Sequence, residues 1–204
     1  MSDGAEKTAG GQFRLLGTRR FAPLFLTQFL GAFNDNLYKN ALIVLITFQS
    51  TQWTAMRPEI LANLAAGLFI LPFFFFSATA GQLADKYDKA RLARLTKLLE
   101  IVIMLVAIAG FLWHSLALLL AALFLLGLQA TLFGPVKYAI LPQHLSEQEL
   151  VGGNAQVEAG TFVAILIGTL AGGLLAGAGV EAVWIAMAGL AVAGAGYLAS
   201  RAIP

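Results

Sequence analysis

The chain has 204 residues, of which 59% are hydrophobic and only 12% are charged. A soluble domain carries about 25% charged residues, so this composition excludes a soluble globular protein and indicates an integral membrane protein. The formal net charge of +2 identifies no partner, and the absence of cysteine excludes disulfides and thiolate metal sites.

Residues 1–20 are small, polar and basic, without the apolar core of a signal peptide. We expect them to form a disordered cytoplasmic tail. Because about 20 apolar residues are needed to cross a bilayer, the rest of the chain predicts a bundle of six membrane spans. These are residues 21–48, 59–83, 95–113, 116–141, 153–178 and 180–201, and residues 202–204 would begin a further loop.

The basic residues predict the orientation of the bundle. Of the 13 Lys and Arg residues, Arg57 lies on one side and Lys39 lies inside the first span. The other eleven fall on the opposite side: Lys7, Arg14, Arg19, Arg20, Lys86, Lys89, Arg91, Arg94, Lys97, Lys137 and Arg201. Since Lys and Arg accumulate in cytoplasmic loops, both termini are predicted to be cytoplasmic.

The first span contains polar side chains at the depth of the bilayer, namely Gln28, Asp35, Asn36, Lys39 and Asn40. A charge at the bilayer centre costs about 2.5–3.5 kcal/mol on insertion scales, so one face of this helix needs a polar environment. Asp35 and Lys39 are four residues apart, a spacing that suits an ion pair. One interpretation is a self-neutralising pair that only packs the bundle. The other, which we favour, is a cavity that binds substrate or a proton.

Later spans add two further features. Lys137 either extends to the membrane interface or pairs with Glu158, while Glu100 competes for Lys137 or pairs with Lys97. In the fifth span, glycines four residues apart are typical of close helix contacts. They are Gly168 with Gly172 and Gly173 with Gly177.

Residues 81–94, GQLADKYDKARLAR, form a charged segment between two apolar runs. Charge alone predicts an ordinary basic loop. The order of Gly81, Leu83, Ala84, Asp85, Lys86 and Lys89 resembles the signature loop between helices 2 and 3 of the major facilitator superfamily, with Asp88 where that family usually has Gly. The resemblance implies a gating loop that comprises Gly81, Asp85, Lys86, Lys89 and Arg91. The Asp85 carboxylate would accept hydrogen bonds from the N-terminus of a neighbouring helix.

Three further segments resemble bacterial lysophospholipid transporters: QFLGAFNDN at 28–36, PVKYAILP at 135–142 and NAQVEA at 154–159. This resemblance implies an all-α fold that is the N-terminal, six-helix half of a twelve-helix transporter in the bacterial inner membrane. Such a protein moves lysophospholipid by alternating access. The implied partners are membrane lipid, lysophospholipid as substrate, a C-terminal six-helix half and, in some members, an attached acyltransferase.

Two alternative functions stay open. One is a polyspecific drug or metabolite exporter on the same fold, and the other is a non-transporting membrane anchor for an attached acyltransferase. Motifs for a nucleotide site, a hydrolase nucleophile or a catalytic zinc are missing from the sequence. We therefore expect no enzyme activity, no cofactor, no metal site and no nucleic-acid partner.

Overall fold

The structure, a computed structural model, describes residues 13–49 and 53–204, and almost all of these residues are helical. Residues 1–12, which include Lys7, and residues 50–52 lie outside the described residues. A short 3-10 helix precedes six long α-helices in the described ranges: η1 (Arg14–Gly17), α2 (Ala22–Phe48), α3 (Pro58–Lys86), α4 (Lys89–Leu112), α5 (Leu116–His144), α6 (Glu147–Gly177) and α7 (Ala182–Arg201).

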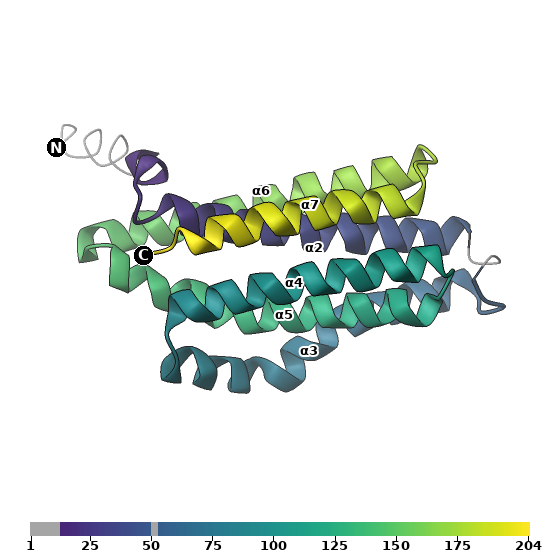
Figure 1. The fold of residues 1–204 in the computed structure, drawn as a ribbon, viewed down its shortest axis with the longest axis horizontal. Helices are drawn as coiled ribbons and strands as arrows, with labels where there is room; N and C mark the ends of the chain where they lie inside the picture. Colours follow the sequence, from purple (N-terminus) through teal and green to yellow (C-terminus); the bar gives the residue numbers. More distant parts are fainter. Residues whose placement is uncertain (1–12, 50–52) are drawn as a thin grey trace.

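The helices run back and forth along one long axis (Figure 1). The α3–α4 and α5–α6 connections lie at the end of the bundle that carries η1 and the C-terminus, and the α4–α5 and α6–α7 connections lie at the opposite end, together with the end of α2 and the start of α3 (Figure 1). Helix α2 packs mainly against α6 and α7, α4 packs against α5 and α7, and α3 packs mainly against α5. Helix α3 bends along its length (Figure 1), and Pro72 inside it explains the bend because proline removes a helical hydrogen bond.

Five of the described helices, α3 to α7, are long and apolar enough to cross a membrane. Helix α2 has 27 residues, which is sufficient length, but it carries the polar stripe predicted from the sequence. Three of its polar residues, Asn34, Asp35 and Asn36, are buried. The bundle therefore places its most polar helix against other helices rather than at its outer surface.

The segment 81–94 is mostly helical, whereas the sequence analysis predicts a loop there. Helix α3 continues through Lys86, and α4 already begins at Lys89. Asp88 accounts for the early start, because its carboxylate accepts a hydrogen bond from the Arg91 backbone N–H at 2.7 Å and caps the helix. Only Tyr87 and Asp88 connect the two helices.

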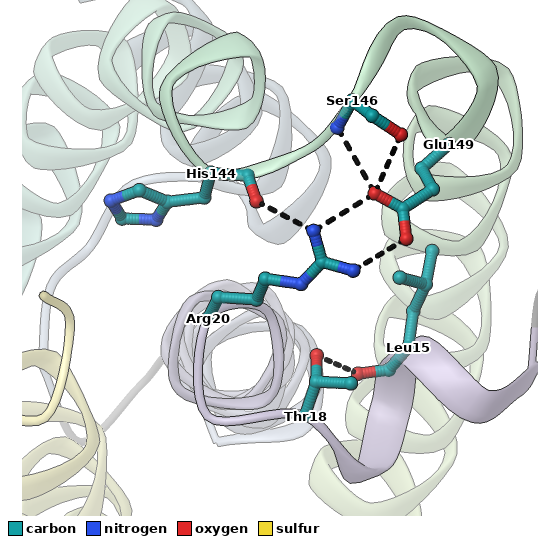
Figure 2. A network of polar contacts seen from close by, with 6 residues as sticks. All are labelled: Leu15, Thr18, Arg20, His144, Ser146 and Glu149. Atoms are coloured by element: carbon teal, nitrogen blue, oxygen red, sulfur yellow. Dashed lines mark hydrogen bonds and ion pairs between the residues drawn. The ribbon is translucent and has the colours of Figure 1, made fainter.

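A polar network at the same end joins the start of α2 to the turn between α5 and α6 (Figure 2). The Arg20 guanidinium contacts the Glu149 carboxylate with both terminal nitrogens, at 2.9 and 2.5 Å, and also donates to the His144 carbonyl at 3.3 Å. The same carboxylate accepts from the Ser146 backbone N–H and hydroxyl at 3.0 and 2.9 Å, which completes a capping box for α6.

The predicted disorder of residues 1–20 is wrong for the described part of that segment. Arg14–Gly17 form η1, and Leu15 is only 3% exposed. Thr18 donates its hydroxyl to the Leu15 carbonyl at 2.7 Å and stabilises the turn into α2. This turn places Arg20 where it reaches Glu149 (Figure 2).

Glycines in α6 allow its backbone to contact the backbone of α2 directly. A Cβ atom added at Gly168 would collide with the Phe33 carbonyl oxygen, and one added at Gly172 would collide with the Leu37 carbonyl oxygen. By contrast, Gly173 has open space around its Cβ position. Of the two glycine pairs in this helix, the first therefore makes the close helix contact.

Candidate substrate cavity

A cavity of about 400 Å³ opens between α2, α3, α5 and α6. Its wall on α2 carries Gln28, Asp35, Asn36 and Lys39. Gln28, Asp35 and Lys39 are one or two helical turns apart and follow one side of the helix, with Asn36 beside them. Aromatic side chains also line the cavity, namely Phe69 and Phe73 from α3 and Phe133 from α5. The cavity therefore combines a charged wall with an apolar wall.

Asp35 lies in this wall with an incompletely satisfied carboxylate. The residue is 7% exposed, and its Oδ1 atom has no hydrogen-bond partner among the described residues. Lys39 does not neutralise it, since no ion pair joins the two within the described chain. Instead, the Lys39 ammonium donates to Asn36 Oδ1 at 2.9 Å and lies 4.8 Å from the centre of the Phe69 ring. An acidic and a basic side chain thus face the cavity without an ion pair between them.

Two other polar residues of α2 differ in their surroundings. Gln28 accepts a hydrogen bond from the Thr161 hydroxyl at 2.7 Å, and its Nε2 atom has no partner among the described residues. Asn40 turns towards α6 and donates to Thr169 Oγ1 at 3.1 Å and to the Asn36 carbonyl at 2.8 Å. Asn40 therefore contributes to α2–α6 packing, whereas Gln28 presents an amide to the cavity.

Lys137 and Glu158, from α5 and α6, are brought together at one edge of the cavity. Their charged atoms are 3.4 Å apart, and the Tyr138 hydroxyl also donates to the Glu158 carboxylate. The Lys137 side chain is 14% exposed and lines the cavity, so it points inward. This contact corresponds to the ion pair that the sequence analysis offers as one of two interpretations for Lys137.

The most deeply buried charged pair among the described residues lies at the edge of this cavity, which Lys97 of α4 also lines, and the sequence analysis placed no site there. Lys97 and Glu100 form an ion pair of 2.7 Å, and each side chain is only 1% exposed. Asn34 donates to the other oxygen of Glu100, Oε1, at 2.8 Å, and Gln129 donates to Oε2, the oxygen that Lys97 contacts, at 3.4 Å. The sequence analysis counted Lys97 among the basic residues of the predicted cytoplasmic side, whereas its side chain is buried between helices; its pairing with Glu100 is one of the two contacts that the sequence analysis offered for that acid. The signal in the sequence is the lone acid Glu100 in an apolar run, three residues after a lysine.

The residues of the predicted gating loop lie away from the cavity, at the α3–α4 end of the bundle. Asp85, Lys86 and Arg91 are exposed, Lys89 is half-buried, and Gly81 has open space around its Cβ position. The structure thus separates two groups of predicted residues: the α2 side chains that share one cavity, and the α3–α4 residues at the bundle end.

Comparison with known proteins gives a consistent match. The model of the Major Facilitator Superfamily matches residues 24–204. The lysophospholipid transporter LplT of Serratia proteamaculans is 31% identical over 186 residues, which are 90% of this chain and 42% of that protein. LplT proteins of Yersinia pestis and Yersinia pseudotuberculosis are 31% identical over 178 residues, 86% of this chain and 39% of each relative. The chain thus spans less than half the length of these curated relatives. No solved structure matches it significantly.

Proposed function

Because the chain belongs to the major facilitator superfamily, we propose that it works as the N-terminal half of a secondary transporter that moves lysophospholipid across the bacterial inner membrane. Membership of this family makes it a multi-pass membrane protein of a transporter family rather than an enzyme. Transport would proceed by alternating access, in which two helical bundles rock about a central site. The second bundle, and in some forms an acyltransferase, would come from a C-terminal region.

The observation that carries this proposal is the unneutralised carboxylate of Asp35 in a cavity within a membrane protein. A buried carboxylate without a full set of partners is costly unless a cation or a hydrogen-bond donor satisfies it. A substrate with a cationic group would supply that partner. Ionisable residues inside membrane helices that face a cavity are by default functional.

The second charge in the cavity narrows the substrate class. Lys39 is held by Asn36 and Phe69 rather than by Asp35, so its ammonium is available to an anion. A zwitterionic headgroup fits this arrangement, with its ammonium at Asp35 and its phosphate at Lys39, because both contacts are charge-assisted hydrogen bonds. Gln28, with its free amide donor, would add a contact to a phosphate or ester oxygen.

The apolar side of the cavity suits the single acyl chain of a lysolipid. Phe73 lines the cavity together with Phe69, whereas the next residue of the aromatic run, Phe74, is 82% exposed. Most of the run from Phe73 to Phe76 therefore covers the outside of α3, where lipid would contact it. One face of α3 would guide the acyl chain while the opposite face meets the bilayer.

The topology and the gate complete the proposal. Eleven of the 13 Lys and Arg residues fall on the predicted cytoplasmic side, and this favours six crossings with both termini in the cytoplasm. Asp85 is exposed on that side and would accept hydrogen bonds from the second bundle in the state closed to the cytoplasm.

An exporter of lipophilic cations is the second candidate, because a carboxylate beside aromatic rings also binds such compounds. Lys39 argues against it, since an unpaired ammonium in the same cavity repels a purely cationic substrate. A lysophospholipid carries both charges and avoids this repulsion.

The test is transport of labelled lysophosphatidylethanolamine by the full-length protein in proteoliposomes. Asp35→Asn keeps the shape of the side chain but removes its charge, and we expect transport to fall about tenfold or more, a loss of roughly 1.4 kcal/mol of binding energy or greater. Glu181→Gln, which neutralises an exposed carboxylate between α6 and α7, is the control and should transport normally. Normal transport by Asp35→Asn would contradict the proposal, and efflux of organic cations that lysolipid does not inhibit would favour the exporter.

A further inference from the structure

The ammonium of the buried Lys97–Glu100 pair lies against α2, one helical turn from Asp35. We propose that Glu100 is a specificity-determining positioning residue, which holds the Lys97 ammonium so that Asp35 stays free for the cationic end of a zwitterionic headgroup. This inference rests on the proposed function of the cavity. It adds the residue that makes the cavity select lysolipids with a cationic group in the headgroup.

The first observation is that donors from three helices fix the Glu100 carboxylate. Lys97 comes from α4, Asn34 from α2 and Gln129 from α5, at 2.7, 2.8 and 3.4 Å. With partners on both oxygens, the carboxylate is held in one position. It therefore defines where the Lys97 ammonium can stay, because that ammonium has no other carboxylate as an ion-pair partner among the described residues.

The second observation places this ammonium beside α2, next to Asp35. A Cβ atom at Gly31 would collide with Lys97 Nζ, so the ammonium lies directly against the helix at that glycine. Asp35 is four residues further along, on the same face of α2 and about 6 Å along the helix axis. Gly31, Asp35 and Lys97 all border the same cavity. A lysine side chain is long and flexible enough to turn from Glu100 to Asp35.

The third observation is the charge count around Asp35. Asp35 lies within electrostatic range of Lys97, Lys39 and Glu100. Lys39 is engaged by Asn36, and Lys97 is engaged by Glu100. Without the Glu100 charge, Lys97 would have an unpaired ammonium in a buried place, and Asp35 would be the nearby group able to neutralise it. The substrate ammonium would then compete with Lys97 for Asp35.

The experiment compares two lysolipids in the full-length protein. Lysophosphatidylethanolamine has an ammonium group for Asp35, whereas lysophosphatidylglycerol has none. In Glu100→Gln, the amide still accepts a hydrogen bond from Asn34 but no longer holds Lys97. We expect the transport KM for lysophosphatidylethanolamine to rise about tenfold, equivalent to roughly 1.4 kcal/mol, while the KM for lysophosphatidylglycerol changes little.

Removing the competing ammonium should reverse the effect. The double variant Lys97→Met/Glu100→Gln has neither charge, so its preference for lysophosphatidylethanolamine should return to that of the unaltered protein. If Glu100→Gln does not accumulate in the membrane, Glu100→Asp carries the test: it keeps the charge but shortens the side chain away from Lys97, so it should raise the KM for lysophosphatidylethanolamine relative to that for lysophosphatidylglycerol, and an unchanged ratio would overturn the inference. Glu181→Gln again serves as the control for neutralising a carboxylate.

The results distinguish a failure of this inference from a failure of the proposed function. If Glu100→Gln weakens both lysolipids equally, or if the double variant fails to restore the preference, the pair only stabilises the bundle and the inference is overturned. If the unaltered protein transports neither lysolipid, the proposed function fails and this inference fails with it. A purely structural role would shift the thermal stability of the variants without altering the ratio of the two KM values.

Discussion

At the scale of single residues, the two buried acids among the described residues, Asp35 and Glu100, have different surroundings. Glu100 receives hydrogen bonds from three side chains, whereas Asp35 Oδ1 receives none among the described residues. A fully paired acid stabilises packing, and an unpaired acid beside a cavity is available to a ligand. Asp35 belongs to a polar stripe and Glu100 is a lone acid in an apolar run, but the sequence left an ion pair with a nearby lysine open for both. Only the three-dimensional neighbours show which of the two is satisfied.

Water should reach the cavity wall on α2, and cysteine labelling can measure this. Ala32 borders the cavity and is half-buried, whereas Ala107 is completely buried in the core between helices. The chain has no native cysteine, so each new one reports alone. We expect Ala32→Cys to react with a water-soluble thiol reagent in membranes and Ala107→Cys to stay unreacted. An inert Ala32→Cys in a folded protein would show a sealed wall, as expected for a non-transporting anchor.

At the scale of helices, the sequence predicted the existence and type of each element better than its ends. The apolar runs indicated the six long helices, since length and hydrophobicity are local properties. The charged residues predicted loops before α4 and α6, but capping side chains start both helices earlier. Asp88 starts α4 six residues before the predicted position, and Ser146 with Glu149 starts α6 early. The buried position of Lys97 was missed because a basic residue near a helix end resembles a cytoplasmic anchor.

The α2–α6 contact should be sensitive to one methyl group at Gly172 and insensitive at Gly173. In Gly172→Ala the new methyl group meets the backbone of α2, and overpacking of this kind costs about 1–3 kcal/mol. In Gly173→Ala it enters open space, so we expect a change within about 0.5 kcal/mol. Thermal unfolding of both variants in detergent tests the difference. Equal melting temperatures would mean that the two helices separate without cost.

At the scale of the whole molecule, the arrangement of helices leaves the cavity bordered by α2, α3, α5 and α6, while α7 packs behind α2. The charged wall is built from the best-packed helix, and the apolar wall comes largely from α3, which bends away from the bundle (Figure 1). Under the proposed function, closely packed helices would hold the side chains that face the substrate, and the α3 side would accommodate acyl chains of different length.

Reporter fusions would test the predicted orientation. Alkaline phosphatase fused after Arg57, at the α2–α3 end of the bundle, should be active because the positive-inside rule places this end outside the cytoplasm. The same enzyme fused after Tyr87, between α3 and α4, should be inactive, and a fluorescent protein fused after Pro204 should fluoresce. The reverse pattern would require both termini to lie outside the cytoplasm.

The contact of Arg20 with Glu149 has a consequence for biosynthesis. It joins residues 129 positions apart, and its carboxylate is also the cap of α6. During translation the first helix enters the membrane long before its partner has left the ribosome. The N-terminal end of α2 therefore lacks this contact while three further helices are inserted. The contact can form only when the fifth long helix has begun to form, so this end of the most polar helix is fixed late in assembly.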